Sequence, residues 1–173
     1  MLDFDSCFSI DRCGRGGGLA LFWRATFDCH LVDYSNNHIS VDVVDPVHGM
    51  WKLTGYYGTP RGDVGKLRGI SFVNNQTTGP WCILGDFNDI MDASEKRGRT
   101  VHSNWLINGF RQAILDSGLV DVPVEEYPFT WFNSLGTPCV VKERLDRALA
   151  NSSWFHLFPN ATLENLAAPY SFE

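Results

Sequence analysis

Apolar and polar residues alternate with a period of two along much of the chain, which is typical of β-strands. In the clearest case, Ile39, Val41 and Val43 alternate with polar neighbours. Short continuous apolar runs elsewhere indicate buried strands. The pattern predicts strands over Leu19–Trp23, Phe27–Leu31, His38–Val44, Trp51–Tyr57, Trp81–Leu84, Phe129–Phe132 and Arg144–Leu149.

Two segments instead carry apolar residues three and four positions apart, which is the period of an amphipathic helix. The first spans residues 63–74, with Asp63 placed to cap it. The second spans residues 104–116 and stops at Gly118. Because strands dominate and helices lie between some of them, we predict an α/β or α+β fold with a layered core. The apolar stripe of the second helix consists of Leu106, Phe110, Ala113 and Ile114.

The composition fits one globular domain of 173 residues, since 44% are hydrophobic and 13% aromatic. A net charge of −6 excludes a histone-like polycation but is compatible with a nuclease. The five scattered cysteines indicate reduced thiols, with Cys82 as a small core residue. Since neither a membrane span nor a signal peptide is visible, we expect a nuclear or cytoplasmic protein that is not secreted.

The segment Trp81–Asn88 joins a buried strand to polar chemistry at its end. Gly85 allows the backbone to turn tightly, and Asp86 then stands at the carboxyl end of the strand, where α/β folds build their sites. Asn88 projects from the same side and can donate to a phosphate oxygen. On its own, this tetrapeptide is more typical of an ordinary turn.

Two further residues favour a phosphate site. Tyr57 ends an apolar strand just before a Gly-x-Pro turn, where its hydroxyl can reach a phosphate. Asp146 interrupts an apolar strand, and a buried carboxylate persists only when it is paired or hydrogen-bonded. Each residue also has a simpler interpretation: Tyr57 as a rim aromatic, and Asp146 as an ordinary salt-bridge partner of Arg144 or Arg147. The combination favours chemistry over these alternatives.

The order of these motifs resembles the endonuclease/exonuclease/phosphatase superfamily. Within it, the chain most resembles the apurinic-type endonuclease domain of plant LINE-type non-LTR retrotransposons, in which the endonuclease accompanies a reverse transcriptase. The segments that carry the resemblance are spread over nearly the whole chain: Gly16–Trp23, Thr54–Pro60, Gly85–Asn88 and Arg144–Leu149.

The resemblance implies a deoxyribonuclease-like or apurinic-endonuclease-like fold, a layered two-sheet β-sandwich flanked by helices, that cleaves phosphodiesters in DNA with a divalent metal, usually Mg²⁺. It implies that Asp86 orients or deprotonates the attacking water and contributes weakly to the metal. Asn88 would contact the phosphate, and Tyr57 would donate to the scissile phosphate. Asp146 would support the site.

The same resemblance leads us to expect one incomplete domain over residues 1–173. The family strands that carry an Asn and the metal-ligating Glu would precede Met1, and the closing Asp-His pair would follow Ser171. Asp86 without that Glu gives a weak Mg²⁺ site. We therefore expect a remnant that is inactive or weakly active.

The only modest basic cluster consists of Lys96–Arg99 with Arg61 and Lys66. In the family, the loop after Gly-Asp-Phe-Asn lies beside the site, so the resemblance makes Arg97 and Arg99 candidate contacts to the DNA backbone; a solvated loop is the alternative. Two other functions stay open. One is a phosphatase of the same superfamily acting on inositol phosphates or lipid headgroups, and the other is a non-catalytic module that binds nucleic acid or protein. Three large aromatic residues are expected in the core: Trp131, Trp154 and Phe158.

Overall fold

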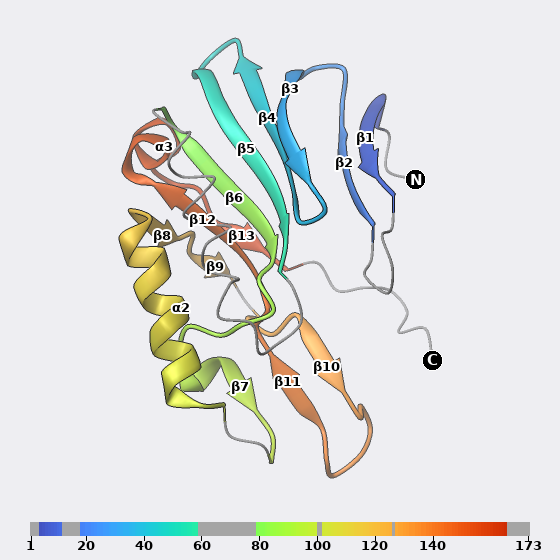
Figure 1. Ribbon diagram of the computed structural model, residues 1–173, viewed down its shortest axis with the longest axis vertical. Coiled ribbons are helices and arrows are strands. Elements are labelled where there is room, and N and C mark those ends of the chain that lie inside the picture. Colours follow the sequence, from blue (N-terminus) through green and yellow to red (C-terminus); the bar gives the residue numbers. More distant parts are fainter. Residues whose placement is uncertain (1–3, 12–17, 59–78, 100–101, 126, 166–173) are drawn as a thin grey trace.

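The centre of the molecule is one sheet of six strands, in the order β3-β4-β5-β6-β12-β8 (Figure 1). The computed structural model describes residues 4–11, 18–58, 79–99, 102–125 and 127–165. All neighbouring strands pair antiparallel except β5 and β6, which are parallel. The strands are β3 (Asp28–Ser35), β4 (His38–Asp45), β5 (Gly49–Tyr57), β6 (Trp81–Asp86), β8 (Leu119–Asp121) and β12 (Asp146–Asn151).

Three smaller sheets lie around this one. A hairpin pairs β1 (Ser6–Ile10) with β2 (Leu19–Trp23). A second sheet has the order β10-β11-β7, and a third pairs β13 with β9. Their strands are β7 (Lys96–Arg97), β9 (Val124–Glu125), β10 (Trp131–Asn133), β11 (Val141–Glu143) and β13 (Leu163–Glu164). The helical elements are η1 (Ala93–Glu95), α2 (Asn104–Asp116) and α3 (Ser152–Leu157).

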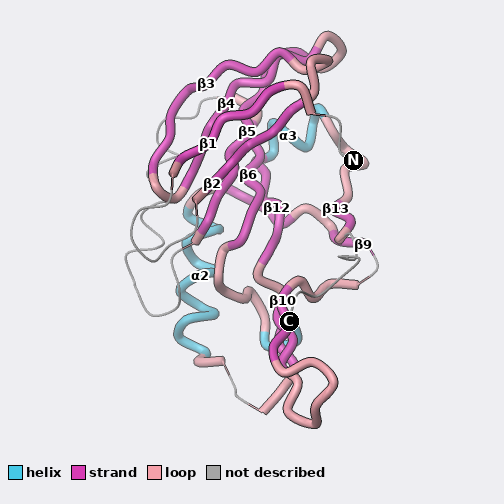
Figure 2. Tube along the Cα trace, turned by 90° about the vertical axis from the view of Figure 1, so that its right-hand side faces the viewer, coloured by secondary structure: helices cyan, strands magenta, loops and turns pink. Residues whose placement is uncertain are grey.

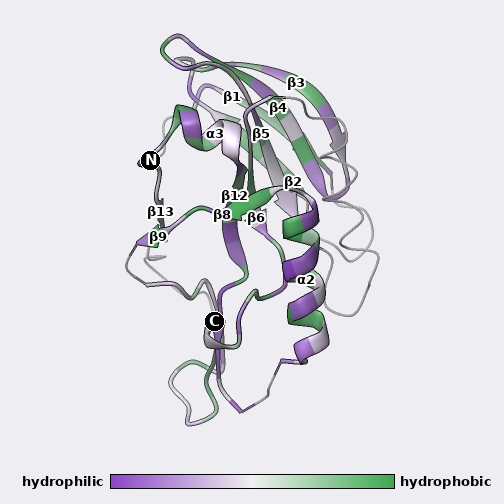
Figure 3. Cartoon of the chain, turned by 90° about the vertical axis from the view of Figure 1, so that its left-hand side faces the viewer, coloured by the Kyte–Doolittle hydropathy of each residue, from purple (hydrophilic) through white to green (hydrophobic). Residues whose placement is uncertain are grey.

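One face of the central sheet packs against α2. Phe110 and Ile114 of the helix join Trp81, Ile83 and Leu149 of the sheet in one buried cluster. Hydrophobic and hydrophilic residues follow one another in bands along α2 (Figure 3), and the buried ones are Ile107, Phe110, Ala113 and Ile114. This packing of a helical stripe on a sheet face gives the first half of a layered core.

The opposite face is covered by the β1–β2 hairpin and by α3. Ile39, Val41 and Val43 of β4 are buried there against Leu19 and Leu21 of the hairpin. Further along the same face, Cys82, Ala148 and Ala150 pack against Trp154 of α3. The hairpin therefore lies as a second layer over β4 and β5 (Figure 2), and the expected mixed fold of packed sheets flanked by helices is confirmed.

The predicted strands and the second helix are present; β2 and α2 have the predicted ends, and the other strands have shifted ends. The strand expected over residues 129–132 occupies 131–133, and the one expected from Arg144 begins at Asp146. In α2 the buried stripe includes Ile107 where we expected Leu106. The helix expected over residues 63–74 lies outside the described residues.

The exposure of the side chains tests the predicted core residues. Trp154 and Cys82 are buried, as predicted, and Phe158 is partly buried against them. The prediction that Trp131 lies in the core is wrong, because this residue is 38% exposed at the start of β10. The four described cysteines are free thiols, in agreement with the expected reduced state. No helix within the described ranges is long and apolar enough to cross a membrane.

Candidate functional site

Strand register brings three of the predicted site residues into one row. Tyr57 at the end of β5 pairs with Asp86 at the end of β6, and Asp86 pairs with Asp146 at the start of β12. Register partners on adjacent strands project from the same face of a sheet. The phenol and the two carboxylates therefore emerge side by side at one edge, at the carboxyl ends of the two parallel strands.

The face from which they emerge follows from the two-residue period of the strands. Cys82, Ala148 and Ala150 all lie on the face that the hairpin and α3 cover. Asp86 lies four residues after Cys82, and Asp146 lies two residues before Ala148, so both aspartates belong to that face. The row consequently opens on the side of the second layer. Arg147, the next residue along β12, projects to the side of α2.

The turn after β6 is fixed by Asn88. The backbone N–H of Asn88 donates to Asp86 Oδ1 at 2.7 Å, and its side-chain amide donates to the carbonyl oxygen of Gly58 at 2.7 Å. Asn88 has a positive φ of 54°, which asparagine tolerates better than most residues. The expected position of Asn88 beside Asp86 is therefore present, and its side chain also ties the turn to the end of β5.

Gly85 is required by a close backbone contact as well as by the tight turn. Its φ is +152°, and a Cβ added there would lie 1.9 Å from the carbonyl oxygen of Tyr56. A second close approach occurs at Gly58, where an added Cβ would lie 2.6 Å from the carbonyl oxygen of Phe87. Backbone packing without side chains thus sets the spacing between β5 and the Asp86 turn.

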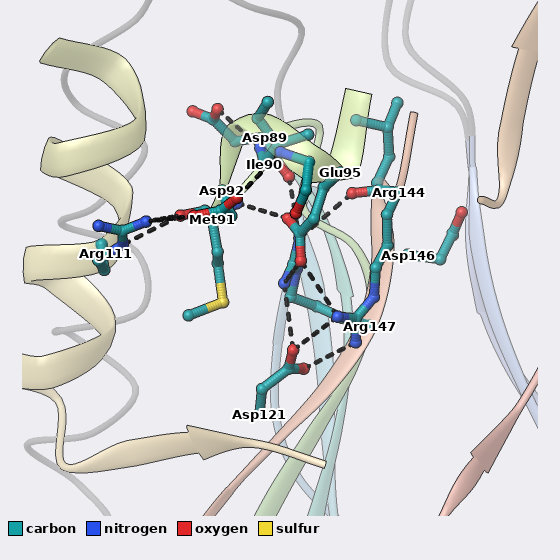
Figure 4. A network of polar contacts seen from close by, with 12 residues as sticks. Asp89, Ile90, Met91, Asp92, Glu95, Arg111, Asp121, Arg144, Asp146 and Arg147 are labelled. Carbon is teal, nitrogen blue, oxygen red and sulfur yellow. Dashed lines mark hydrogen bonds and ion pairs between the residues drawn. The ribbon is translucent and has the colours of Figure 1, made fainter. Parts of the chain in front are cut away.

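Asp146 does not form the salt bridge that its neighbours suggested. Arg144 and Arg147 both pair with Glu95 and Asp121, and the Asp146 side chain points away from their guanidinium groups (Figure 4). The simpler interpretation of Asp146 as their ion-pair partner is therefore wrong. For Arg147 the physical reason is alternation along β12, which places it on the face opposite Asp146. Arg144 precedes the strand, and its guanidinium is already paired with Glu95 and Asp121.

A buried charged cluster on the α2 side of β12 consists of Arg144, Arg147, Glu95 and Asp121. Arg147 is fully buried and donates to Glu95 Oε2 at 2.8 Å, while Arg144 Nη1 lies 2.9 Å from Asp121 Oδ2. Burial raises the pKa of Glu95, but the hydrogen bond and charge of Arg147 outweigh it and hold that pKa below its ordinary value. For Asp121, burial prevails and the pKa is raised, with Arg147 and Arg144 opposing.

The backbone beside Asp146 is held by a residue that sequence reasoning did not weigh. Thr130 Oγ1 accepts from the N–H groups of Leu145 at 3.1 Å and Asp146 at 3.0 Å. The carbonyl oxygen of Leu145 in turn accepts from the N–H of Phe87 at 2.9 Å. In the sequence, the available signal is a threonine between two aromatic residues, Phe129 and Trp131, in a predicted strand.

The candidate DNA contacts belong to the small β10-β11-β7 sheet, below the central sheet in Figure 1. Arg97 is exposed, and its guanidinium lies 5.3 Å from the centre of the Phe129 ring, while Arg99 is exposed just beyond β7. Lys96 is not part of a solvated loop, because it is buried and lies 2.7 Å from Glu143. The described part of the basic cluster therefore divides into one structural lysine and two exposed arginines, and Arg61 and Lys66 lie outside the described residues.

The described residues do not by themselves fit a complete metal site. Mg²⁺ binds through carboxylates and keeps several waters or substrate oxygens. Asp86 and Asp146 supply two adjacent carboxylates. Within the ranges that the structure describes, however, no group of three His, Cys, Asp or Glu side chains lies close enough to hold an ion.

Comparison with solved structures supports the fold. The endonuclease domain of TRAS1, a telomere-specific non-LTR retrotransposon, matches with a TM-score of 0.67 and 15% identity, over 86% of this chain and 68% of that one. The 3′ phosphatase NExo from Neisseria, bound to product DNA hairpin, matches with a TM-score of 0.52 and 19% identity, over 85% of this chain and 66% of that one. The catalytic domain of Xenopus laevis APE2 matches with a TM-score of 0.52 and 15% identity, over 84% of this chain and 66% of that one.

The chain thus spans about two thirds of each of these three structures. No curated protein matches it by sequence. The model of the Endonuclease/Exonuclease/phosphatase family matches residues 7–164, which include the whole row of site residues. The chain belongs to the Endonuclease/Exonuclease/phosphatase family.

Proposed function

We propose that the row formed by Tyr57, Asp86 and Asp146 is the phosphodiester site of a DNA-nicking endonuclease. The observation that carries the proposal is the register of β5, β6 and β12, which brings a phenol and two carboxylates from three distant parts of the chain to one sheet edge. A phosphoryl-transfer site needs mainly groups that position the reactants and stabilise charge.

Each residue of the row has a role that its chemistry suits. Asp86 orients or deprotonates the attacking water, and the Tyr57 hydroxyl donates to the scissile phosphate. One N–H of the Asn88 amide holds Gly58, and we assign the other to a phosphate oxygen. Asp146, held through its own backbone N–H, supports Asp86 from the neighbouring strand.

The similar structures support DNA as the substrate. The TRAS1 domain is described as an endonuclease, and the Neisseria enzyme is bound to a DNA hairpin. We assign the exposed Arg97 and Arg99 to the DNA backbone, where each would act by charge alone. The same likeness supports a LINE-type retroelement as the origin, which a reverse transcriptase reading frame in the flanking nucleotide sequence would test.

Turnover by the described residues should be weak. The family generally uses divalent metals, and two carboxylates without a third ligand hold Mg²⁺ poorly. The family's nicking activity would survive in this chain only at a trace level.

Nicking of supercoiled plasmid by the purified chain, with and without Mg²⁺, tests the proposal. We expect slow nicking at high protein concentration that Asp86→Asn abolishes. Asp116→Asn provides the matched control, because this exposed carboxylate at the end of α2 bonds only locally, to Gln112. Asp116→Asn should nick at the wild-type rate.

Two results would count against the proposal in different ways. Nicking that is equal in wild type and Asp86→Asn would show a contaminant or a different site, and would refute the assigned row. Rapid nicking that Asp86→Asn abolishes would keep the row but refute the weak-metal argument.

A further inference from the structure

Thr130 occupies a junction between the two strands that carry the site carboxylates. It lies in the segment that leads into β10, and its N–H donates to the carbonyl oxygen of Glu143 at 3.0 Å. Its hydroxyl accepts from the N–H groups of Leu145 and Asp146, at 3.1 and 3.0 Å. A threonine hydroxyl has two lone pairs, and these two successive amides use both of them.

The peptide group between Leu145 and Asp146 is also bonded, on its other side, to the turn that follows Asp86. The carbonyl oxygen of Leu145 accepts from Phe87 N–H at 2.9 Å, and Phe87 lies between Asp86 and Asn88. One residue, Leu145, is thus bonded through its N–H to Thr130 and through its carbonyl to the turn. The hydroxyl of Thr130 is therefore connected to Asp146 directly and to Asp86 through a single buried peptide.

In the described part of the chain, the Thr130 hydroxyl is the acceptor for these two amides. Leu145 is 5% exposed, so an unsatisfied N–H at this position would be costly. A ladder bond to β8 does not replace the hydroxyl, because β8 pairs with Leu149 to Asn151 of β12 and not with Asp146. The side chain of one threonine consequently accepts the hydrogen bonds that a neighbouring strand would otherwise accept, at the point where β12 enters the site.

We propose that Thr130 is a positioning residue, whose hydroxyl sets the separation and orientation of the Asp86 and Asp146 carboxylates. The structural part of this inference stands on the hydrogen bonds alone; its consequence for hydrolysis rests on the proposed function. Thr130 acts through the backbone and is not itself assigned a contact with the substrate.

Three variants of the full chain separate this role from general stability. Thr130→Val keeps the shape of the side chain but removes the acceptor, whereas Thr130→Ser keeps the hydroxyl. Thr137→Val is the matched control, because Thr137 Oγ1 also accepts from a backbone N–H, that of Cys139, in the exposed β10–β11 connection. If Thr130→Val does not fold, Thr130→Ala admits a water to the two amides and replaces it.

The first readout is the pair of side-chain carboxyl carbon shifts of Asp86 and Asp146, recorded by NMR at one fixed neutral pH. In Thr130→Val we expect both shifts to change, because the two carboxylates change their mutual distance and orientation. Amide exchange at residues 145 and 146 should accelerate about tenfold or more. Thr130→Ser and Thr137→Val should keep the wild-type carboxyl shifts. Wild-type carboxyl shifts in Thr130→Val, with or without faster exchange, would overturn the proposal.

The second readout separates this proposal from the proposed function. Where nicking depends on Asp86, Thr130→Val should lower its maximal rate about tenfold with an unchanged half-saturating DNA concentration, and Thr130→Ser should restore it. An unchanged rate alongside changed carboxyl shifts would overturn the catalytic consequence of positioning. Absence of any Asp86-dependent nicking would refute the proposed function, and the carboxyl shifts at fixed pH would still decide the role of Thr130.

Discussion

At the scale of single residues, the site depends on a position where no side chain fits. Gly85 was expected to allow a tight turn, and the structure gives a more specific reason, since its missing Cβ leaves room for the carbonyl oxygen of Tyr56. A side chain here would push β6 away from β5 and break the row at its middle. Sequence alone indicates that a glycine matters at such a turn, but it does not reveal which neighbouring atom requires it.

Gly85→Ala should therefore destabilise the protein by about 2 kcal/mol or more, because the new methyl group meets backbone that cannot move aside. Chemical denaturation monitored by tryptophan fluorescence measures this loss. Gly136→Ala is the control, because Gly136 also has a positive φ, +76°, but an added Cβ would meet nothing within 4 Å. Equal losses in the two variants would show that backbone conformation, and not the contact with Tyr56, explains the glycine.

Burial of Cys82 makes stability depend on alkaline pH. Burial raises the pKa of this thiol from 9.0 to about 12. Above pH 9 the unfolded chain therefore loses the proton while the folded chain keeps it, so the free energy of unfolding falls as the pH rises, by about 1 kcal/mol per pH unit. Below pH 9 this dependence disappears.

Urea unfolding at pH 8, 9 and 10 measures that slope. Cys82→Ala should flatten it, because the variant has no thiol to titrate at this position. Cys139→Ala should keep it, since Cys139 is exposed in the β10–β11 connection. The account of Cys82 would be wrong if both variants showed the wild-type slope.

At the scale of elements, the two faces of β12 carry different groups of charged side chains. Its α2 side carries the charged cluster of Arg144, Arg147, Glu95 and Asp121, and the opposite side carries Asp146. The cluster joins β12 to β8 and to the segment that follows the Asp86 turn. The arginines next to Asp146 in sequence thus anchor the strand and leave the aspartate to the site.

Arg147→Met should lower the free energy of unfolding by about 3–5 kcal/mol, because it leaves Glu95 and Asp121 buried near each other without their main counter-charge. Arg111→Met removes an exposed pair with Asp92 and should cost far less, because water screens that pair. Thermal unfolding of the two variants gives the comparison. Similar small losses in both would show that water screens the cluster far more than its burial indicates.

The strands and the second helix could be predicted because their periodicity is local. The strand over residues 38–44 and the helix over 104–116 were found to within a residue or two. The partners of Arg144 and Arg147 could not be found, because Glu95 and Asp121 lie 23 to 52 residues away and nothing in the local pattern selects them. Short elements such as β7 and α3 are too brief to show a period.

At the scale of the whole molecule, the site exists only through long-range pairing. Tyr57, Asp86 and Asp146 are spread over ninety residues of sequence, and two strand registers align them. The motifs identified the residues and the family resemblance proposed their roles. Sequence could not supply the register, because shifting any of these strands by one residue would turn its side chain to the opposite face.

The most direct test of the central claim is a binding experiment, because binding does not depend on turnover. A short DNA duplex is added to the full chain, and the backbone amide chemical shifts report where it binds. The account predicts that the largest shift changes occur at Tyr57, at Asp86 to Asn88 and at Asp146, and that they weaken with added salt. Shift changes at β7 and elsewhere, with the amides of this row unmoved at saturating DNA, would contradict the account.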